Sequence, residues 1–144
     1  MPSFTPIFIP GLLCTELLFA KQRANLPNQG YIADTTSHDS IHEMAMAALD
    51  LCDGPLVPIG LSMGGYVALE MARLAPQRMA AMALLSSNCR NDSAENQRQR
   101  QQVIALAKHK GFQGVTRHLM PRLLSEAALQ DLSLIHISEP TRPY

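Results

Sequence analysis

A single serine stands among glycines in the segment GLSMGG, residues 60–65, directly after the apolar run PLVPI. A serine hydroxyl is a weak nucleophile until the backbone holds it clear of the packing, next to a base and to donors for an oxyanion. A tight turn from a strand into a helix does this, because it strains the backbone and exposes the Oγ above the sheet edge. Ser62 is therefore the candidate nucleophile.

The glycines around Ser62 have the spacing that such a turn requires. Strand and helix approach so closely that the positions two before and two after the serine, Gly60 and Gly64, cannot carry a side chain, and Gly65 adds room where the helix begins. A G-x-S-x-G string alone arises by chance in roughly 5% of chains this long. An apolar strand before it and an amphipathic helix after it make the interpretation specific, against a glycine-tightened turn with an incidental serine.

An oxyanion hole needs two backbone donors. The first candidate is the amide of Met63, immediately after the serine, where the helix dipole also favours negative charge. The second should come from the loop after an earlier strand, and PGLL after PIFI is the candidate loop. There Gly11 permits a sharp turn, and we expect the Leu12 amide to face the same space as Ser62.

Short apolar runs alternate with helical stretches over the first 89 residues, which is typical of a parallel α/β sheet. Ser40 and Glu43 form a capping box that opens a helix, and Pro76 ends the helix that follows Ser62. Pro58 is unexpected inside a central strand, since it lacks a ladder donor. We predict strands at 6–9, 31–34, 55–59 and 80–86, with 55–59 central, and helices at about 16–26, at 41–52 and after Ser62.

The character of the sequence changes near residue 90. No strand-like run follows, and residues 90–131 are expected to form two or three helices, broken at Gly111, Gly114 and Pro121. The predicted organisation is an α/β core at 1–89, the start of a helical cap at 90–131, and a tail at 132–144.

Composition excludes several classes of function. Twelve basic residues balance twelve acidic ones, so neither nucleic acid nor an anionic membrane is an expected partner. The N-terminus lacks a basic region before its apolar stretch, which argues against a signal peptide or a spanning helix. Three widely spaced cysteines without a CxxC pair indicate neither a disulfide framework nor a zinc site. We expect a cytoplasmic protein without metal or cofactor.

These motifs resemble the α/β-hydrolase superfamily, in particular its small bacterial esterase-like members. FIPGLLCTELLF is similar to their strand and oxyanion loop, and GLSMGGYVALEMARLAPQRMAAMALL to their nucleophile turn, helix and next strand. The resemblance extends from residue 6 to about 131. It implies an α/β-hydrolase fold, Ser62 as nucleophile, and Leu12 and Met63 as oxyanion donors.

The resemblance also implies a chain order of serine, then acid, then histidine, with both partners after the cap. His38 and His42 precede the serine, and His109 and His118 lie in the expected cap helices. His136 follows an apolar run, but residues 132–142, LSLIHISEPTR, resemble codon by codon the translation of a transposase sequencing adapter. We therefore expect the acid and the base beyond residue 131, in a part that this truncated chain lacks.

The sequence favours a serine hydrolase that acts on a small carboxylic ester or thioester through an acyl-enzyme on Ser62, and that is inactive as this truncated chain. An enol-lactonase, a thioesterase or a menaquinone-pathway-type lyase on the same fold fits nearly as well, because the cap and pocket choose the substrate. A non-catalytic hydrolase-like binding fold is the alternative of a different class. The full gene would discriminate between these classes: an Asp and a His after the cap would favour the enzyme, and their absence would favour the binding fold.

Overall fold

The computed structural model describes residues 4–127, apart from the side chains of residues 110–120, 122 and 123. The chain divides into two compact units, Met1–Cys89 and Arg90–Tyr144. The expectations for His136 and for the tail at 132–144 lie outside the described residues, as do those for residues 128–131.

The first unit alternates strands and helices. Its elements in chain order are β1 (Thr5–Ile9), the 3-10 helix η1 (Glu16–Phe19), α1 (Ala20–Ala24), β2 (Tyr31–Ile32), α2 (Ile41–Leu49), β3 (Leu56–Leu61), α3 (Met63–Leu74), the 3-10 helix η2 (Pro76–Arg78) and β4 (Ala83–Leu85).

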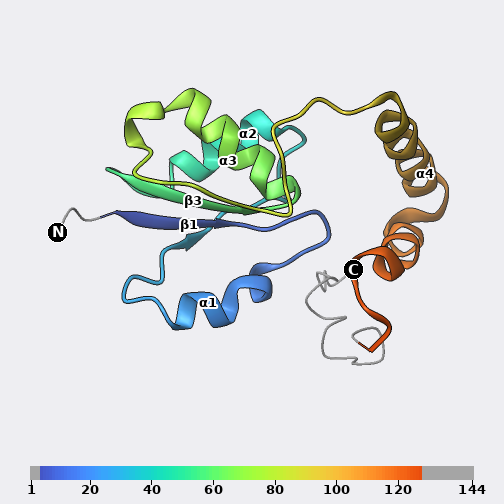
Figure 1. Ribbon diagram of the computed structural model, residues 1–144, viewed down its shortest axis with the longest axis horizontal. Helices are drawn as coiled ribbons and strands as arrows, with labels where there is room; N and C mark the ends of the chain where they lie inside the picture. The colour runs from blue at the N-terminus through green and yellow to red at the C-terminus, as the bar shows by residue number, and fades with distance from the viewer. Residues whose placement is uncertain (1–3, 128–144) are drawn as a thin grey trace. The chain divides into compact units, whose positions relative to one another are not determined.

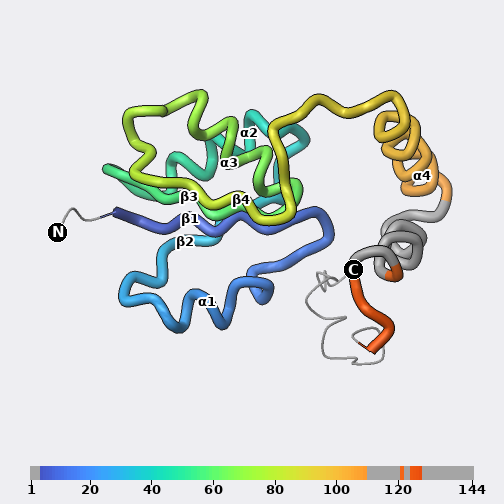
Figure 2. Tube along the Cα trace, viewed as in Figure 1, coloured from blue at the N-terminus to red at the C-terminus, as the bar shows by residue number. Residues whose placement is uncertain are grey.

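The four strands form one parallel sheet in the order β2-β1-β3-β4, which confirms the predicted sheet. Figure 2 labels the four strands along the chain. β3 lies between β1 and β4, so the expectation of a central strand here is confirmed. Its register on β1 runs from Thr5 opposite Leu56 to Ile9 opposite Gly60. The outer strands are shorter than predicted: the expected strand at 31–34 is two residues long, and that at 80–86 is three.

Helices cover the sheet on both faces, with α2 and α3 on one face and α1 on the other (Figure 1). Right-handed crossovers explain this division. The chain moves from β1 to β2 in one direction across the sheet, and from β2 to β3 and on to β4 in the opposite direction, so the helices leave on opposite faces.

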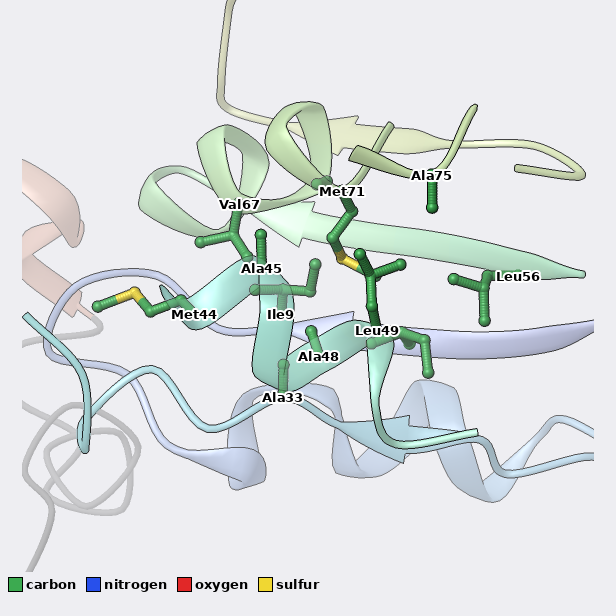
Figure 3. Packing of buried hydrophobic residues seen from close by; sticks show 12 residues of the cluster. Ile9, Ala33, Met44, Ala45, Ala48, Leu49, Leu56, Val67, Met71 and Ala75 are labelled. Atoms are coloured by element: carbon green, nitrogen blue, oxygen red, sulfur yellow. The ribbon is translucent and has the colours of Figure 1, made fainter. Parts of the chain in front are cut away.

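The main core lies between the sheet and the α2–α3 layer (Figure 3). Alternate residues of β1 point to opposite faces. Ile7 and Ile9 belong to this core, whereas Phe8 packs on the other face against Phe19, with ring centroids 5.1 Å apart. Burying such side chains stabilises the fold by about 1.5–3 kcal/mol each. Other members of the main core are Ala33, Met44, Ala45, Ala48, Leu49, Leu56, Val67, Ala68, Met71 and Ala75.

Local signals set the helix ends. The Ser40 Oγ accepts the Glu43 amide at 3.1 Å and caps α2 as predicted. The Glu43 carboxylate accepts from the Ser40 hydroxyl at 3.1 Å. α3 ends at Leu74, and Pro76 then begins η2, since a proline cannot continue the helix ladder.

The structure supplies an explanation for Pro58. Backbone groups alternate in direction along a strand, and the carbonyl of Leu56 accepts Ala80 N–H, on the side of β3 where β4 lies. Pro58 therefore faces the same side. The β3–β4 ladder begins only at Ile59 opposite Ala83, so the missing donor of Pro58 stands where the neighbouring chain has not yet formed a strand. The proline ring is fully buried and adds to the packing.

The second unit contains one long helix, α4 (Ala94–Leu123). The predicted breaks at Gly111, Gly114 and Pro121 are therefore wrong, because α4 continues through all three residues. After a break at residues 124–125 the chain is helical again at 126–127, where the described residues end. A glycine costs a helix about 1 kcal/mol but keeps its N–H in the ladder. Pro121 has no N–H to donate to the carbonyl four residues earlier, so α4 lacks one hydrogen bond there, and the helix ends two residues later. The side chain of Ser93 caps the helix by accepting the Asn96 amide at 3.2 Å.

Within residues 4–127, none of the helices combines the length and the apolar character needed to cross a membrane.

Truncation of a core side chain should separate fold stability from surface effects. Leu56 in β3 is 0% exposed, so Leu56→Ala is expected to lower the free energy of unfolding by about 2–5 kcal/mol. The matched control is Leu17→Ala, the same change at a side chain that is 51% exposed, where we expect a change within about 0.5 kcal/mol. Urea denaturation followed by circular dichroism measures both, and equal effects would contradict the described core.

Candidate functional site

The site lies at the carboxyl ends of β1 and β3, the two central strands. The helices that follow these strands leave the sheet on opposite faces (Figure 1). In open α/β sheets, this change of direction leaves a crevice outside the carboxyl ends of the strands, where ligands bind. The loop after β1 begins at Pro10, and Ser62 directly follows β3. Both candidate segments therefore meet at the switch point of the sheet.

Ser62 occupies a strained turn between β3 and α3, which we call the elbow (residues 60–65). Its backbone has φ 52° and ψ −112°, a combination that L-residues rarely adopt. Its N–H donates to the Leu85 carbonyl at 2.8 Å, and its own carbonyl accepts Gly65 N–H at 3.0 Å. The residue is exposed, and no hydrogen bond of its Oγ is seen in the described part of the chain. The backbone is thus held at both ends while the hydroxyl stays open.

The glycines of the elbow allow backbone to pack on backbone. A Cβ on Gly60 would stand within 3.0 Å of the Gly64 carbonyl group, and a Cβ on Gly64 within 3.0 Å of the carbonyl groups of Ile9 and Pro10. Real Cβ atoms essentially never come so close to backbone atoms. A Cβ on Gly65 would meet the side chain of Ser87. The close approach inferred from the sequence is therefore present at all three positions.

The loop after β1 reaches the elbow through Gly11. A Cβ on Gly11 would lie 3.1 Å from the Leu61 carbonyl oxygen and 3.5 Å from the Cβ of Ser62. Leu12 follows directly, so the structure brings this loop and the serine together. Met63 is the first residue of α3, and the first amides of a helix have no partner within it. In the described residues no acceptor bonds the Leu12 or the Met63 amide. Their role as oxyanion donors stays a prediction.

Backbone strain gathers at this edge of the sheet. Among the described non-glycine residues, three have a positive φ: Leu13 at 65°, Ser62 at 52° and Ser86 at 48°. Each follows the carboxyl end of a strand, and the Ser62 N–H donates to the carbonyl of Leu85, the residue directly before Ser86. Such conformations cost of order 1–3 kcal/mol each and persist where the surrounding packing imposes them, which is typical of functional sites.

No hydrogen bond joins Ser62 to His38, His42 or His109, the histidines whose side chains are described. The Nδ1 of His42 in α2 lies 2.9 Å from Glu70 Oε1 in α3. Arg73 forms a second ion pair with the same carboxylate oxygen, at 2.7 Å. Hydrogen bonds from Arg73 first, and then from His42, lower the pKa of Glu70 to about 2. This cluster joins α2 to α3 on the surface. His118 lies where side chains are not described, and His109 belongs to the second unit.

Two residues near the sheet edge were missed by sequence reasoning. The Ser87 Oγ is buried and has no hydrogen-bond partner among the described residues, and it packs against Gly65. Its signal was the polar pair that directly follows the apolar run ALL. Asp34, after β2, accepts the Thr36 amide at 2.7 Å and the Ser37 amide at 3.2 Å. Hydrogen bonds from Ser37 and Thr36 lower the pKa of Asp34 to about 2.

No group of three or more His, Cys, Asp or Glu residues with metal-binding geometry occurs in the described part of the chain. Cys14 and Cys52 are half-buried free thiols, and burial raises the pKa of the Cys14 thiol.

Alanine substitutions at the elbow glycines should differ in how much they destabilise the chain, because the neighbouring atoms differ in how easily they can move. We expect Gly64→Ala to destabilise the chain by more than about 3 kcal/mol, because its Cβ meets the backbone of β1, which cannot move aside. Gly65→Ala meets only the Ser87 side chain, so the second change Ser87→Gly should restore stability to Gly65→Ala but not to Gly64→Ala. Thermal unfolding of the four variants tests this. A Gly64→Ala protein as stable as the parent would refute the close packing.

Comparison with known proteins agrees with this arrangement. A family model described as the alpha/beta hydrolase fold matches residues 21–120. The match includes the elbow but begins after the loop that carries Leu12. The position of this loop beside Ser62 is therefore supported by the geometry of the structure and not by the family match. No curated protein matches the chain. Because the family model covers more than half of the sequence, this chain belongs to the alpha/beta hydrolase fold family.

Proposed function

We propose that the protein is a serine hydrolase that cleaves a small carboxylic ester or thioester through an acyl-enzyme on Ser62. The observation that carries the proposal is the backbone of Ser62, whose φ of 52° places an exposed hydroxyl at the switch point of the sheet. Backbone strain of this kind clusters at functional sites, and of the strained residues Ser62 is the one that directly joins β3 to α3 at the switch point. The family supports hydrolase-like chemistry, and the ester or thioester substrate is our own extension.

The proposed reaction follows from the groups around Ser62. The Oγ attacks the substrate carbonyl as its proton leaves, and negative charge develops on the carbonyl oxygen. The amides of Leu12 and Met63 donate to that oxygen, and the N-terminal end of α3 favours its charge. The tetrahedral intermediate then collapses: its C–O or C–S bond breaks, the alcohol or thiol leaves with a proton, and the acyl group stays on the Oγ. Water attacks this acyl-enzyme, which releases the carboxylic acid and returns the proton to Ser62. Loss of one such donor typically costs about 10²–10³ in rate.

The proton of Ser62 needs an acceptor, and no described residue is hydrogen-bonded to the Ser62 Oγ. His42 is engaged by Glu70, and no described histidine is hydrogen-bonded to Ser62. Without a base, the oxyanion donors and substrate binding alone still accelerate hydrolysis roughly 10³-fold over the uncatalysed reaction in water. We therefore expect this chain to show slow single acylation or phosphonylation of Ser62 and little repeated turnover.

A fluorophosphonate should label the chain at Ser62. We expect slow addition of one phosphonyl group, located by peptide mass mapping on Ser62, and none on Ser62→Ala. The matched control is Ser37→Ala, an exposed serine in the loop after β2, which should label like the parent. A parent that stays unlabelled, or a Ser62→Ala variant labelled at the same rate, would refute the nucleophile and favour a non-catalytic binding fold.

Steady-state turnover of p-nitrophenyl acetate should stay low in this chain. We expect a rate near that of Ser62→Ala, since deacylation also needs a base. His136→Ala should have no effect, because we attribute residues 132–142 to an adapter-like tail. Robust turnover that is abolished by His136→Ala would show instead that His136 is a working base.

A further inference from the structure

The segment that follows β4, residues 85–87, contacts the elbow at two points. The Leu85 carbonyl accepts the Ser62 N–H at 2.8 Å. A Cβ on Gly65 would stand 2.3 Å from the Oγ and 2.5 Å from the Cβ of Ser87, so the Ser87 side chain lies directly on the backbone of Gly65. Ser86, between them, has φ 48°, so the chain leaves the strand conformation immediately after β4. One short segment therefore holds the elbow by a hydrogen bond and by a side-chain contact.

The two contact points are the two ends of one turn. The Gly65 N–H donates to the Ser62 carbonyl at 3.0 Å, which closes the first turn of α3. A displacement of Gly65 must therefore shift the carbonyl of Ser62 or break this bond. The position of Gly65 is in this way coupled to the backbone of Ser62.

The strained backbone of Ser62 needs restraint from both neighbouring strands. A positive φ at a non-glycine residue persists only where the surrounding structure imposes it. From β1, the restraint is the contact of Gly64 with the carbonyls of Ile9 and Pro10. From the end of β4, it is the contact of Ser87 with Gly65. Beyond the Ser87 side chain, the next atom near that position on Gly65 is the Gly60 carbonyl oxygen, at 3.7 Å, so loss of this side chain would leave Gly65 free to shift.

We propose that Ser87 is a positioning residue for Ser62: its side chain supports Gly65, and together with the Leu85 carbonyl it fixes the turn that holds the nucleophile. This inference rests on the proposed serine-hydrolase function. The support is a packing contact, because the Ser87 Oγ is buried and has no hydrogen-bond partner among the described residues. An alanine at position 87 keeps the Cβ and therefore most of this support, whereas a glycine removes it.

Four variants of the full chain test the role of Ser87. Ser87→Gly removes the contact, and Ser87→Ala is the matched control that keeps the Cβ. Gly65→Ala alone places a Cβ where the Ser87 side chain already lies, so it should also disturb the turn. The double variant Gly65→Ala with Ser87→Gly moves the carbon to the other side of the same contact. Because it carries the same flexible glycine at position 87, its recovery would separate the contact from backbone freedom.

The first measurement is the rate of Ser62 phosphonylation by a fluorophosphonate. We expect Ser87→Gly and Gly65→Ala to react about tenfold more slowly than the parent, because a displacement of about 1 Å at a reacting group can cost about 10² in rate. Ser87→Ala and the double variant should stay within about threefold of the parent, well inside that loss. Thermal unfolding establishes that each variant is folded.

The second measurement is hydrogen exchange of the Ser62 amide, followed by NMR, which does not depend on activity. The Ser62 N–H is bonded to Leu85, so we expect its exchange to be about tenfold faster in Ser87→Gly and to return to the parent rate in the double variant. The Val67 amide, in the buried part of the same helix, should exchange at the parent rate in every variant, which excludes a general loss of stability as the cause.

The outcomes separate the two proposals. Ser87→Gly that labels as fast as a labelled parent overturns the role of Ser87 and leaves Ser62 as nucleophile. Slow labelling of the double variant, or of Ser87→Ala, also overturns it, since both retain a carbon in the contact. A parent that is not labelled at Ser62 contradicts the proposed function. Amide exchange then decides the structural part of the inference alone: unchanged exchange at Ser62 in Ser87→Gly would overturn it.

Discussion

The contact of the Gly64 backbone with the end of β1 is the constraint on which the rest of the site depends. Because Gly64 carries no side chain, the first turn of α3 rests directly on the carbonyls of Ile9 and Pro10, and Gly60 rests on Gly64 in the same way. Two central strands and one helix thus meet at a single place without side chains between them. The chain can enter α3 from β3 only through a sharp turn, and Ser62 takes the strained conformation of that turn.

The core supplies the free energy that holds this strain. Val67, Ala68 and Met71 anchor α3 on the sheet, one or two turns after Ser62, and all three are fully buried. Burial of such side chains, at about 1.5–3 kcal/mol for the larger ones, outweighs a backbone cost of order 1–3 kcal/mol at Ser62. The hydrogen bond from Ser62 N–H to Leu85 adds a connection to β4. An elbow on a poorly packed helix would relax, and its hydroxyl would lose its position.

The parts of the fold that sequence could predict are those with local causes. Periodicity indicated the four strands, Ser40 with Glu43 marked the start of α2, and the glycine spacing marked the elbow. What it could not predict depends on neighbours distant in sequence. Pro58 fits because the β3–β4 ladder begins one residue later, and His42 pairs with Glu70 only because α2 packs against α3. The left-handed Leu13 has no local signal, since leucine does not favour positive φ.

β4 links the stability of the sheet edge to the geometry of the site. Leu84 and Leu85 are 37% and 42% exposed, and in the described residues β4 pairs with β3 alone, which leaves an apolar strand with an open edge. Such edges favour association with other strands. The carbonyl of Leu85 also accepts Ser62 N–H, and the Ser87 hydroxyl beyond it packs on Gly65. A segment that pairs with β4 would therefore affect the contacts of the elbow at both Ser62 and Gly65. Because the Ser62 N–H is bonded to Leu85, a segment that covers this edge would restrain the backbone of Ser62, the proposed nucleophile, and one that distorts β4 would relax the strained backbone that exposes its hydroxyl.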